Sequence, residues 1–229
     1  MSSSDITPHA LIFDFDGLIM DTEWPIYAIW AELFEENGAE LLLERWGVCV
    51  GNGENRFDPV AELQQLTGRS FDAKELETEH RKRFHQRFKP EPLPGVMELL
   101  HQAESLGWKI ACASSSPISW VGKHLETLGI LGRFQAICTA DDVRLTKPDP
   151  ELFLLAMQRL GVRGEHAIVV EDSPHGITAA KAAGALAVAV PNRVTRVLDL
   201  SHADARVSSL LEVDLLALME ERRRLGRSA

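Results

Sequence analysis

Short runs of apolar residues recur along the chain, and each run ends abruptly at a polar cluster. The first run covers residues 10–13 and is followed directly by Asp14. Similar runs cover residues 108–113, 134–139, 167–170 and 185–190. Short apolar runs bounded by turn residues predict buried strands.

Helical segments with clear punctuation separate these runs. We expect helices over residues 94–106, 116–129, 149–161 and 173–184. Three of them open on a polar residue followed by proline, namely Ser116-Pro117, Asp149-Pro150 and Ser173-Pro174. The polar residue is expected to cap the helix, proline to take the first helical position, and glycine to follow the end. Strands that alternate with helices of this length predict an α/β fold with a doubly wound parallel sheet.

One long stretch, from Glu23 to Pro90, breaks this rhythm and shows only helical patterns. Helices are expected over residues 24–37 and 58–68, and a charged helix is expected to start at Asp72. A proline-rich connector follows over residues 90–95. We therefore predict a Rossmann-like core made of residues 1–22 and 91–229, with a helical cap inserted at residues 23–90. A short strand near residues 205–207 and a last helix complete the core.

The charge balance excludes several classes of partner. The chain of 229 residues has a formal net charge of −10. Sequence-independent binding of nucleic acid needs lysines and arginines that neutralise phosphates, so neither nucleic acid nor an anionic membrane is an expected partner. The three cysteines form no CxxC pair. The N-terminal residues lack a signal-peptide pattern, so a cytoplasmic location is expected. The sequence does not indicate an oligomeric state, and a monomer is the default expectation.

The polar residues that follow the apolar runs carry the candidate chemistry. In a parallel sheet, Asp14, Asp16, Ser114, Glu171 and Asp172 would gather at one edge, where ligands bind in open α/β sheets. Carboxylates that converge repel one another unless a cation lies between them. Oxygen ligands of this kind suit Mg²⁺. Lys147, held between prolines before a predicted helix, offers one further positive charge, although a solvated loop lysine is the simpler explanation.

The motifs resemble those of the haloacid-dehalogenase superfamily. The run Asp14-Phe15-Asp16-Gly17 looks like the first motif, and Ser114, Lys147 and Glu171-Asp172 resemble the second, third and fourth in the same order. The resemblance covers residues 11–192 and looks closest to the β-phosphoglucomutase-like branch, whose members carry a small helical cap. It implies a phosphatase, a hydrolase of phosphate monoesters.

The resemblance also assigns roles to these residues. Asp14 would be the nucleophile that forms an aspartyl-phosphate, and Asp16 the general acid and base. Lys147 would be a catalytic residue that neutralises charge on Asp14 and on the phosphate. Ser114, Ser115 and Lys147 would bind the phosphoryl group. The metal ligands would be Asp14, the backbone carbonyl of Asp16, Asp172 and, directly or through water, Glu171.

The substrate and the exact reaction stay open at this level. A small phosphorylated metabolite, with sugar phosphates as the leading class, is the expected partner. Asn52 and Arg56, in a loop of the cap, are the candidates for substrate contact, although a solvated surface position explains Arg56 equally well. Of the tryptophans, Trp24 is the one expected to line the cleft.

Two other functions compete with the phosphatase. One is a phosphomutase of the β-phosphoglucomutase type, but the position of its cap histidine corresponds to Ile26 here, which favours hydrolysis. The other is a non-catalytic protein that binds a phosphate ligand. The presence of the full set of motif residues argues against that alternative, although fold alone does not decide function.

Overall fold

The computed structural model describes residues 9–47, 50 and 57–226. The strands are β1 (Ala10–Phe13), β2 (Lys109–Ala113), β3 (Ala136–Cys138), β4 (Ala167–Glu171), β5 (Leu186–Ala189) and β6 (Ala205–Arg206). They form a six-stranded sheet in the order β3-β2-β1-β4-β5-β6, and every neighbouring pair is parallel. The predicted α/β fold with a doubly wound parallel sheet is therefore confirmed.

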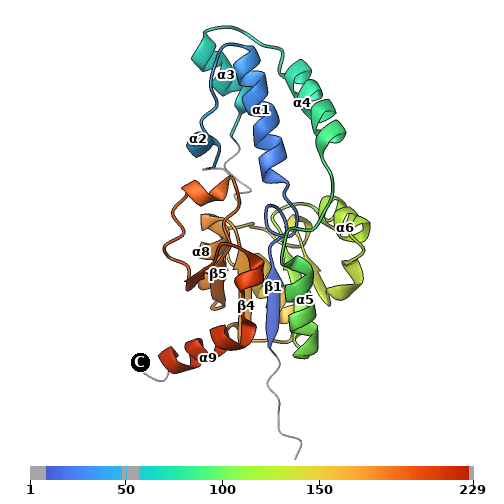
Figure 1. Cartoon of the computed structure of the whole chain (residues 1–229), viewed down its shortest axis with the longest axis vertical. Coiled ribbons are helices and arrows are strands. Elements are labelled where there is room, and N and C mark those ends of the chain that lie inside the picture. The colour runs from blue at the N-terminus through green and yellow to red at the C-terminus, as the bar shows by residue number, and fades with distance from the viewer. Residues whose placement is uncertain (1–8, 48–49, 51–56, 227–229) are drawn as a thin grey trace, which may run out of the picture.

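Helices surround this sheet and extend beyond one of its ends (Figure 1). They are α1 (Glu23–Glu36), α2 (Leu43–Gly47), α3 (Pro59–Thr67), α4 (Ala73–Arg87), α5 (Val96–Ser105), α6 (Ile118–Thr127), α7 (Glu151–Leu160), α8 (Pro174–Ala182) and α9 (Leu215–Gly226). Among the residues that the structure describes, no helix has both the length and the apolar character needed to cross a bilayer.

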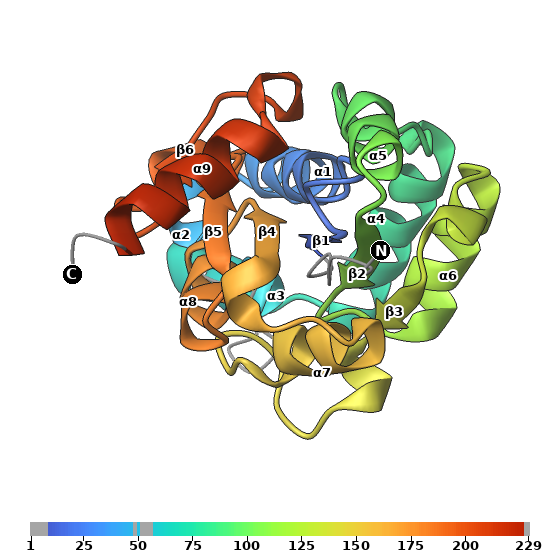
Figure 2. The ribbon, with the colours of Figure 1, turned by 90° about the horizontal axis from the view of Figure 1, so that it is seen from below.

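The sheet is buried on both faces, as the uninterrupted apolar runs require. In β1, Leu11 and Phe13 point into one hydrophobic cluster, while Ala10 and Ile12 point into another. Helices α5 and α9 cover the first face, and α7 and α8 cover the second (Figure 2). The side chains of the central strand therefore have no contact with water, and only its carboxyl end is free to present chemistry.

Helices α1 to α4 form a layer of their own beyond the carboxyl ends of the strands (Figure 1). They enclose a separate hydrophobic cluster that includes Trp30, Phe34, Leu63 and Phe84. This is the place that the sequence predicted for a helical cap. The division of the chain into a core and a cap domain at residues 22 and 90 stays a prediction.

The helix caps agree with the sequence only in part. Ser173 caps α8, since its hydroxyl accepts a hydrogen bond from the Gly176 N–H at 3.1 Å. The expectation is wrong for α6 and α7, where Pro117 and Pro150 stand at the capping position and make no side-chain cap. The reason for α6 is that the Ser116 hydroxyl instead donates to Asp16 at 2.6 Å, in the site described next.

Candidate active site

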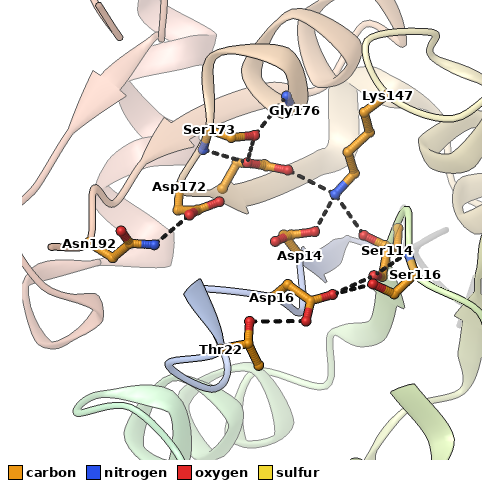
Figure 3. Close-up of polar contacts among 12 residues, drawn as sticks. Asp14, Asp16, Thr22, Ser114, Ser116, Lys147, Asp172, Ser173, Gly176 and Asn192 are labelled. Carbon is orange, nitrogen blue, oxygen red and sulfur yellow. Dashed lines mark hydrogen bonds and ion pairs between the residues drawn. The ribbon is translucent and has the colours of Figure 1, made fainter. Parts of the chain in front are cut away.

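The backbone of the parallel strands brings the candidate residues to one edge of the sheet (Figure 3). The ladder continues past the end of β1, because the Asp14 N–H donates to the Val170 carbonyl at 3.1 Å. It also continues past β2, where the Ser114 N–H donates to the Cys138 carbonyl at 3.0 Å. Asp14 therefore lies beside Glu171, the last residue of β4, and Ser114 lies at the same edge on the other side of β1.

Lys147 lies at the centre of this edge, and only 1% of its surface is exposed. Its ammonium group donates to Glu171 Oε1 at 2.8 Å, to the Ala113 carbonyl at 2.9 Å and to Asp14 Oδ1. Burial alone would lower the pKa of Lys147, but the charges of Asp14 and Glu171 outweigh it and raise that pKa above its ordinary value. Lys147 is therefore a permanently charged member of the site and not a solvated loop lysine.

Three buried carboxylates, those of Asp14, Glu171 and Asp172, have ligand atoms within 4.8 Å of one another. Burial, only partly offset by Lys147, raises the pKa of Asp14 to about 8. Burial and the charge of Glu171 also raise the pKa of Asp172 well above its usual range. One ammonium group faces three carboxylates, so the cluster lacks positive charge. A hard divalent cation with oxygen ligands fits such a donor set.

Neighbouring groups hold two of these carboxylates in place. Glu171 Oε2 accepts hydrogen bonds from the Ser173 N–H at 2.8 Å and from the Ser173 hydroxyl at 2.9 Å. Asp172 Oδ2 accepts one from the Asn192 side-chain amide at 2.6 Å. The sequence motifs do not predict a site role for Ser173 or Asn192. The one signal for Asn192 is its position two residues after an apolar run, at the same edge as the other site residues.

The Asp16 carboxylate turns away from this acidic cluster (Figure 3). Its Oδ1 accepts from the Thr22 hydroxyl at 3.0 Å and from the Trp120 indole N–H at 2.9 Å. Its Oδ2 accepts from the hydroxyls of Ser116 at 2.6 Å and Ser114 at 3.3 Å. A contact between Asp16 and a metal ion would therefore have to come from the backbone carbonyl, as the resemblance implies.

Ser115 faces the same space with an unused polar atom. Its hydroxyl oxygen is buried and has no hydrogen-bond partner among the described residues. A buried hydroxyl without a partner is costly unless a ligand or water completes it. The position beside Ser114 and Lys147 suits a group that donates to a phosphoryl oxygen.

A cavity of about 440 Å³ lies over these residues and under the cap. Ile26, Trp46 and Val50 line it from the cap side, and Trp120 lines it from α6. Glu23 also lines it, and burial together with the charges of Asp16 and Asp14 raises the pKa of Glu23 to about 8. The expectation for Trp24 is wrong, because its ring lies outside this lining.

The reason lies in the contact that Trp24 makes instead. The Arg193 guanidinium lies over the Trp24 ring, 3.8 Å from its centroid. This cation–π contact holds the ring against the core. Asn52 and Arg56, the candidates for substrate contact, lie outside the described residues.

Comparison with known proteins identifies the family of this chain over most of its length. The family model of haloacid dehalogenase-like hydrolases matches residues 11–190. YhcW of Bacillus subtilis, named as a phosphatase, is 44% identical over 92% of this chain and 96% of its own length. The phosphorylated carbohydrates phosphatase of Thermotoga maritima is 31% identical over 92% of this chain and 94% of its own.

A solved structure agrees with these sequence matches. The crystal structure of a β-phosphoglucomutase from Clostridium difficile is 26% identical and superimposes with a TM-score of 0.72. The match covers 96% of this chain and all of that one. The chain therefore belongs to the haloacid dehalogenase-like hydrolase family, on its phosphatase branch, as the four motifs predicted.

Proposed function

We propose that this protein is an Mg²⁺-dependent phosphatase that hydrolyses a small phosphorylated metabolite through an aspartyl-phosphate on Asp14. The observation that carries the proposal is the environment of the Asp14 carboxylate. Lys147 donates to Oδ1, whereas Oδ2 accepts no hydrogen bond from a described residue and Asp14 lines the cavity. A buried carboxylate with one free oxygen, facing a cavity beside a cation, is placed to act as a nucleophile.

In the first step, Asp14 Oδ2 attacks phosphorus and the bond to the leaving oxygen breaks. Asp16 gives a proton to that oxygen, so that the dephosphorylated leaving group departs as a neutral alcohol. Ser114, Ser115 and Lys147 hold the phosphoryl oxygens and neutralise their charge during the transfer.

In the second step, Asp16 takes a proton from water, and the water oxygen attacks the phosphorus of the aspartyl-phosphate. The bond between phosphorus and Asp14 then breaks and inorganic phosphate leaves. Among the described residues, Asp16 is the only cavity-lining carboxylate that accepts hydrogen bonds from Ser116 and Trp120, which suits it to serve both steps.

Asp14, Asp172 and the backbone carbonyl of Asp16 would hold Mg²⁺, and Glu171 would support it directly or through water. When bound, Mg²⁺ supplies positive charge to the transferring phosphoryl group and to Asp14. The proposal fits the cluster of three carboxylates around one ammonium group. The raised pKa values of Asp14 and Asp172 reflect a shortage of positive charge there.

The relatives support sugar phosphates as the substrate class. The Thermotoga maritima protein is named for phosphorylated carbohydrates. A cavity of about 440 Å³ has a volume suited to a small metabolite, and Glu23 offers it an acceptor for hydroxyl groups. We infer that the substrate is a small phosphate monoester with a hydroxylated leaving group.

A phosphomutase is the second candidate, because a β-phosphoglucomutase shares the fold over nearly the whole chain. A mutase must deliver its phosphoryl group to a second hydroxyl while it excludes water. Ile26, which lines the cavity at the position of the mutase's cap histidine, can neither donate nor accept a proton. Hydrolysis is therefore the favoured outcome.

The test is phosphate release from a panel of phosphorylated metabolites in the presence of Mg²⁺. The panel includes both anomers of glucose 1-phosphate, and glucose 6-phosphate formation is followed in parallel. Rapid phosphate release from one class of ester supports the proposal and identifies the substrate class. Glucose 6-phosphate that forms without free phosphate would establish a mutase, and no turnover of any ester would leave only a binding function.

A further inference from the structure

We propose that Trp120 is a positioning residue for Asp16 and that it links the orientation of Asp16 to helix α4. The proposal rests on the acid–base role proposed above for Asp16. Trp120 belongs to α6, lies outside the four sequence motifs, and contacts both the core and the layer formed by helices α1 to α4.

The contact with Asp16 is a directed hydrogen bond. The Trp120 indole N–H donates to Asp16 Oδ1 at 2.9 Å, and this oxygen also accepts from the Thr22 hydroxyl at 3.0 Å. A hydroxyl hydrogen rotates to suit its acceptor, whereas an indole N–H is fixed in the plane of its ring. Trp120 therefore determines where Asp16 Oδ1 lies more strictly than the hydroxyl donors do.

The contact with the cap is aromatic. The centroid of the Trp120 ring lies 6.4 Å from that of Phe84 and 6.4 Å from that of Phe88. Phe84 belongs to α4 and Phe88 is the residue that ends it. The two phenyl rings stack on each other at 4.6 Å, so they form one surface against the indole. Aromatic pairs at these separations contribute beyond their buried area.

A residue of the core also packs against the indole. His124, one turn further along α6, meets the Trp120 ring edge-on at 4.3 Å. The His124 ring also stacks on Phe15, the residue between the two aspartates, at 6.4 Å. Trp120 belongs to the hydrophobic clusters of both the core and the cap. A shift of the end of α4 relative to the sheet would therefore displace the indole, and with it the hydrogen bond to Asp16.

A simpler role for Trp120 is that of a cavity wall, since its side chain lines the cavity. The two roles differ in one measurable way. A wall residue changes how well a substrate binds, whatever its leaving group. A residue that positions the general acid matters most when the leaving oxygen needs a proton.

The first experiment compares leaving groups in a Trp120→Phe variant, which keeps an aromatic ring but loses the indole N–H together with one of the two fused rings. The value of kcat/KM reports the steps up to departure of the leaving group. An alkyl phosphate needs a proton at that point, whereas p-nitrophenolate departs without one. We expect the ratio of kcat/KM for the alkyl ester to that for p-nitrophenyl phosphate to fall about tenfold, a modest part of what a general acid contributes.

The control is Trp108→Phe, the same substitution at a tryptophan that stacks on His9 at 5.1 Å and does not line the cavity. Its ratio should equal that of the wild type. If Trp120→Phe lowers both kcat/KM values by the same factor, Trp120 is only a wall and the proposal is overturned.

The second experiment needs no turnover, so it tests Trp120 even if the proposed reaction is wrong. Each of the five tryptophans gives one indole N–H signal in a ¹⁵N–¹H NMR spectrum, and Trp120→Phe identifies the relevant one. We expect Asp16→Asn to shift that signal, because the charged acceptor is lost. We also expect Phe88→Leu to shift it, because the phenyl ring that packs against the indole at the end of α4 is lost. A signal that stays in place in either variant would overturn the link between α4 and Asp16.

Discussion

Asp14 shows at the scale of one residue how burial and charge compete in this site. Burial raises the pKa of its carboxyl group to about 8, although Lys147 donates to one of its oxygens. A protonated Asp14 would be a poor nucleophile at neutral pH. The site therefore needs more positive charge than Lys147 supplies, which is the physical argument for a divalent cation at the acidic cluster.

Replacing Asp14 by asparagine should abolish turnover and keep the fold. Asparagine has nearly the same shape but no nucleophilic oxygen, so kcat should fall by more than about 10³-fold. Phosphate release on the best substrate of the panel measures this, and far-UV circular dichroism checks the fold. Asp199→Asn, at an exposed carboxylate that accepts from the nearby Ser201 N–H, should keep wild-type activity. Activity of Asp14→Asn near that of the wild type would exclude Asp14 as the nucleophile.

The motif residues of the site could be predicted from the sequence, but several of their partners could not. Asp14, Ser114 and Glu171 each follow or end an apolar run, and parallel pairing brings such positions together. Trp120 follows no such rule, and Asn192 lies two residues beyond the end of its run. Their contacts with Asp16 and Asp172 span 104 and 20 positions of sequence and depend on the packing of α6 and of the segment after β5.

At the scale of the element, helix α8 shows how closely a helix can approach the site. Gly176 lies in its first turn, and a Cβ at this position would lie 1.7 Å from Glu171 Oε1. Glu171 also holds Lys147 and accepts from Ser173, so it has little room to move. The proline and the serine cap at the start of α8 were readable from the sequence, but the need for glycine was not, because it arises from a neighbouring strand.

Two glycines within helices therefore give opposite expectations on replacement by alanine. Gly176→Ala should destabilise the protein by about 1–3 kcal/mol, the usual cost of an overpacked site, and should displace Glu171. Gly122→Ala, in α6, places a Cβ in ordinary contact with Ile118 at 3.6 Å. It should stabilise the protein by about 0.5–1 kcal/mol, because alanine loses less entropy than glycine in a helix.

Urea unfolding followed by circular dichroism measures both changes as shifts of the midpoint. If Gly176→Ala were as stable as the wild type and equally active, the close contact between α8 and Glu171 would be refuted. A destabilising Gly122→Ala would show that the helix interior of α6 lacks the space described here.

At the scale of the whole molecule, the acidic cluster makes the stability of the metal-free protein depend on pH. The pKa values of Asp14 and Asp172 are higher in the folded protein than in the unfolded chain, mainly because burial disfavours their charged forms. Between the ordinary aspartate pKa of about 4 and about pH 8, the folded state therefore binds more protons than the unfolded state. Their contribution to stability is fully present below about pH 4 and is lost as the pH rises toward 8.

The metal-free protein should accordingly melt at a lower temperature at about pH 8 than at about pH 5, and Mg²⁺ should raise the melting temperature more at the higher pH. Binding requires the ionised carboxylates, so the cation stabilises the form that burial disfavours. A loss of about 2 kcal/mol across this range corresponds to a decrease of about 4–8 °C in a chain of this size. Differential scanning calorimetry with a chelator and with Mg²⁺ measures both effects.

Asp14→Asn serves as the matched variant, because it removes one titrating group and one candidate ligand and should reduce both the pH dependence and the Mg²⁺ shift. Equal Mg²⁺ shifts in the wild type and in Asp14→Asn would place the cation elsewhere and would separate Asp14 from the acidic cluster.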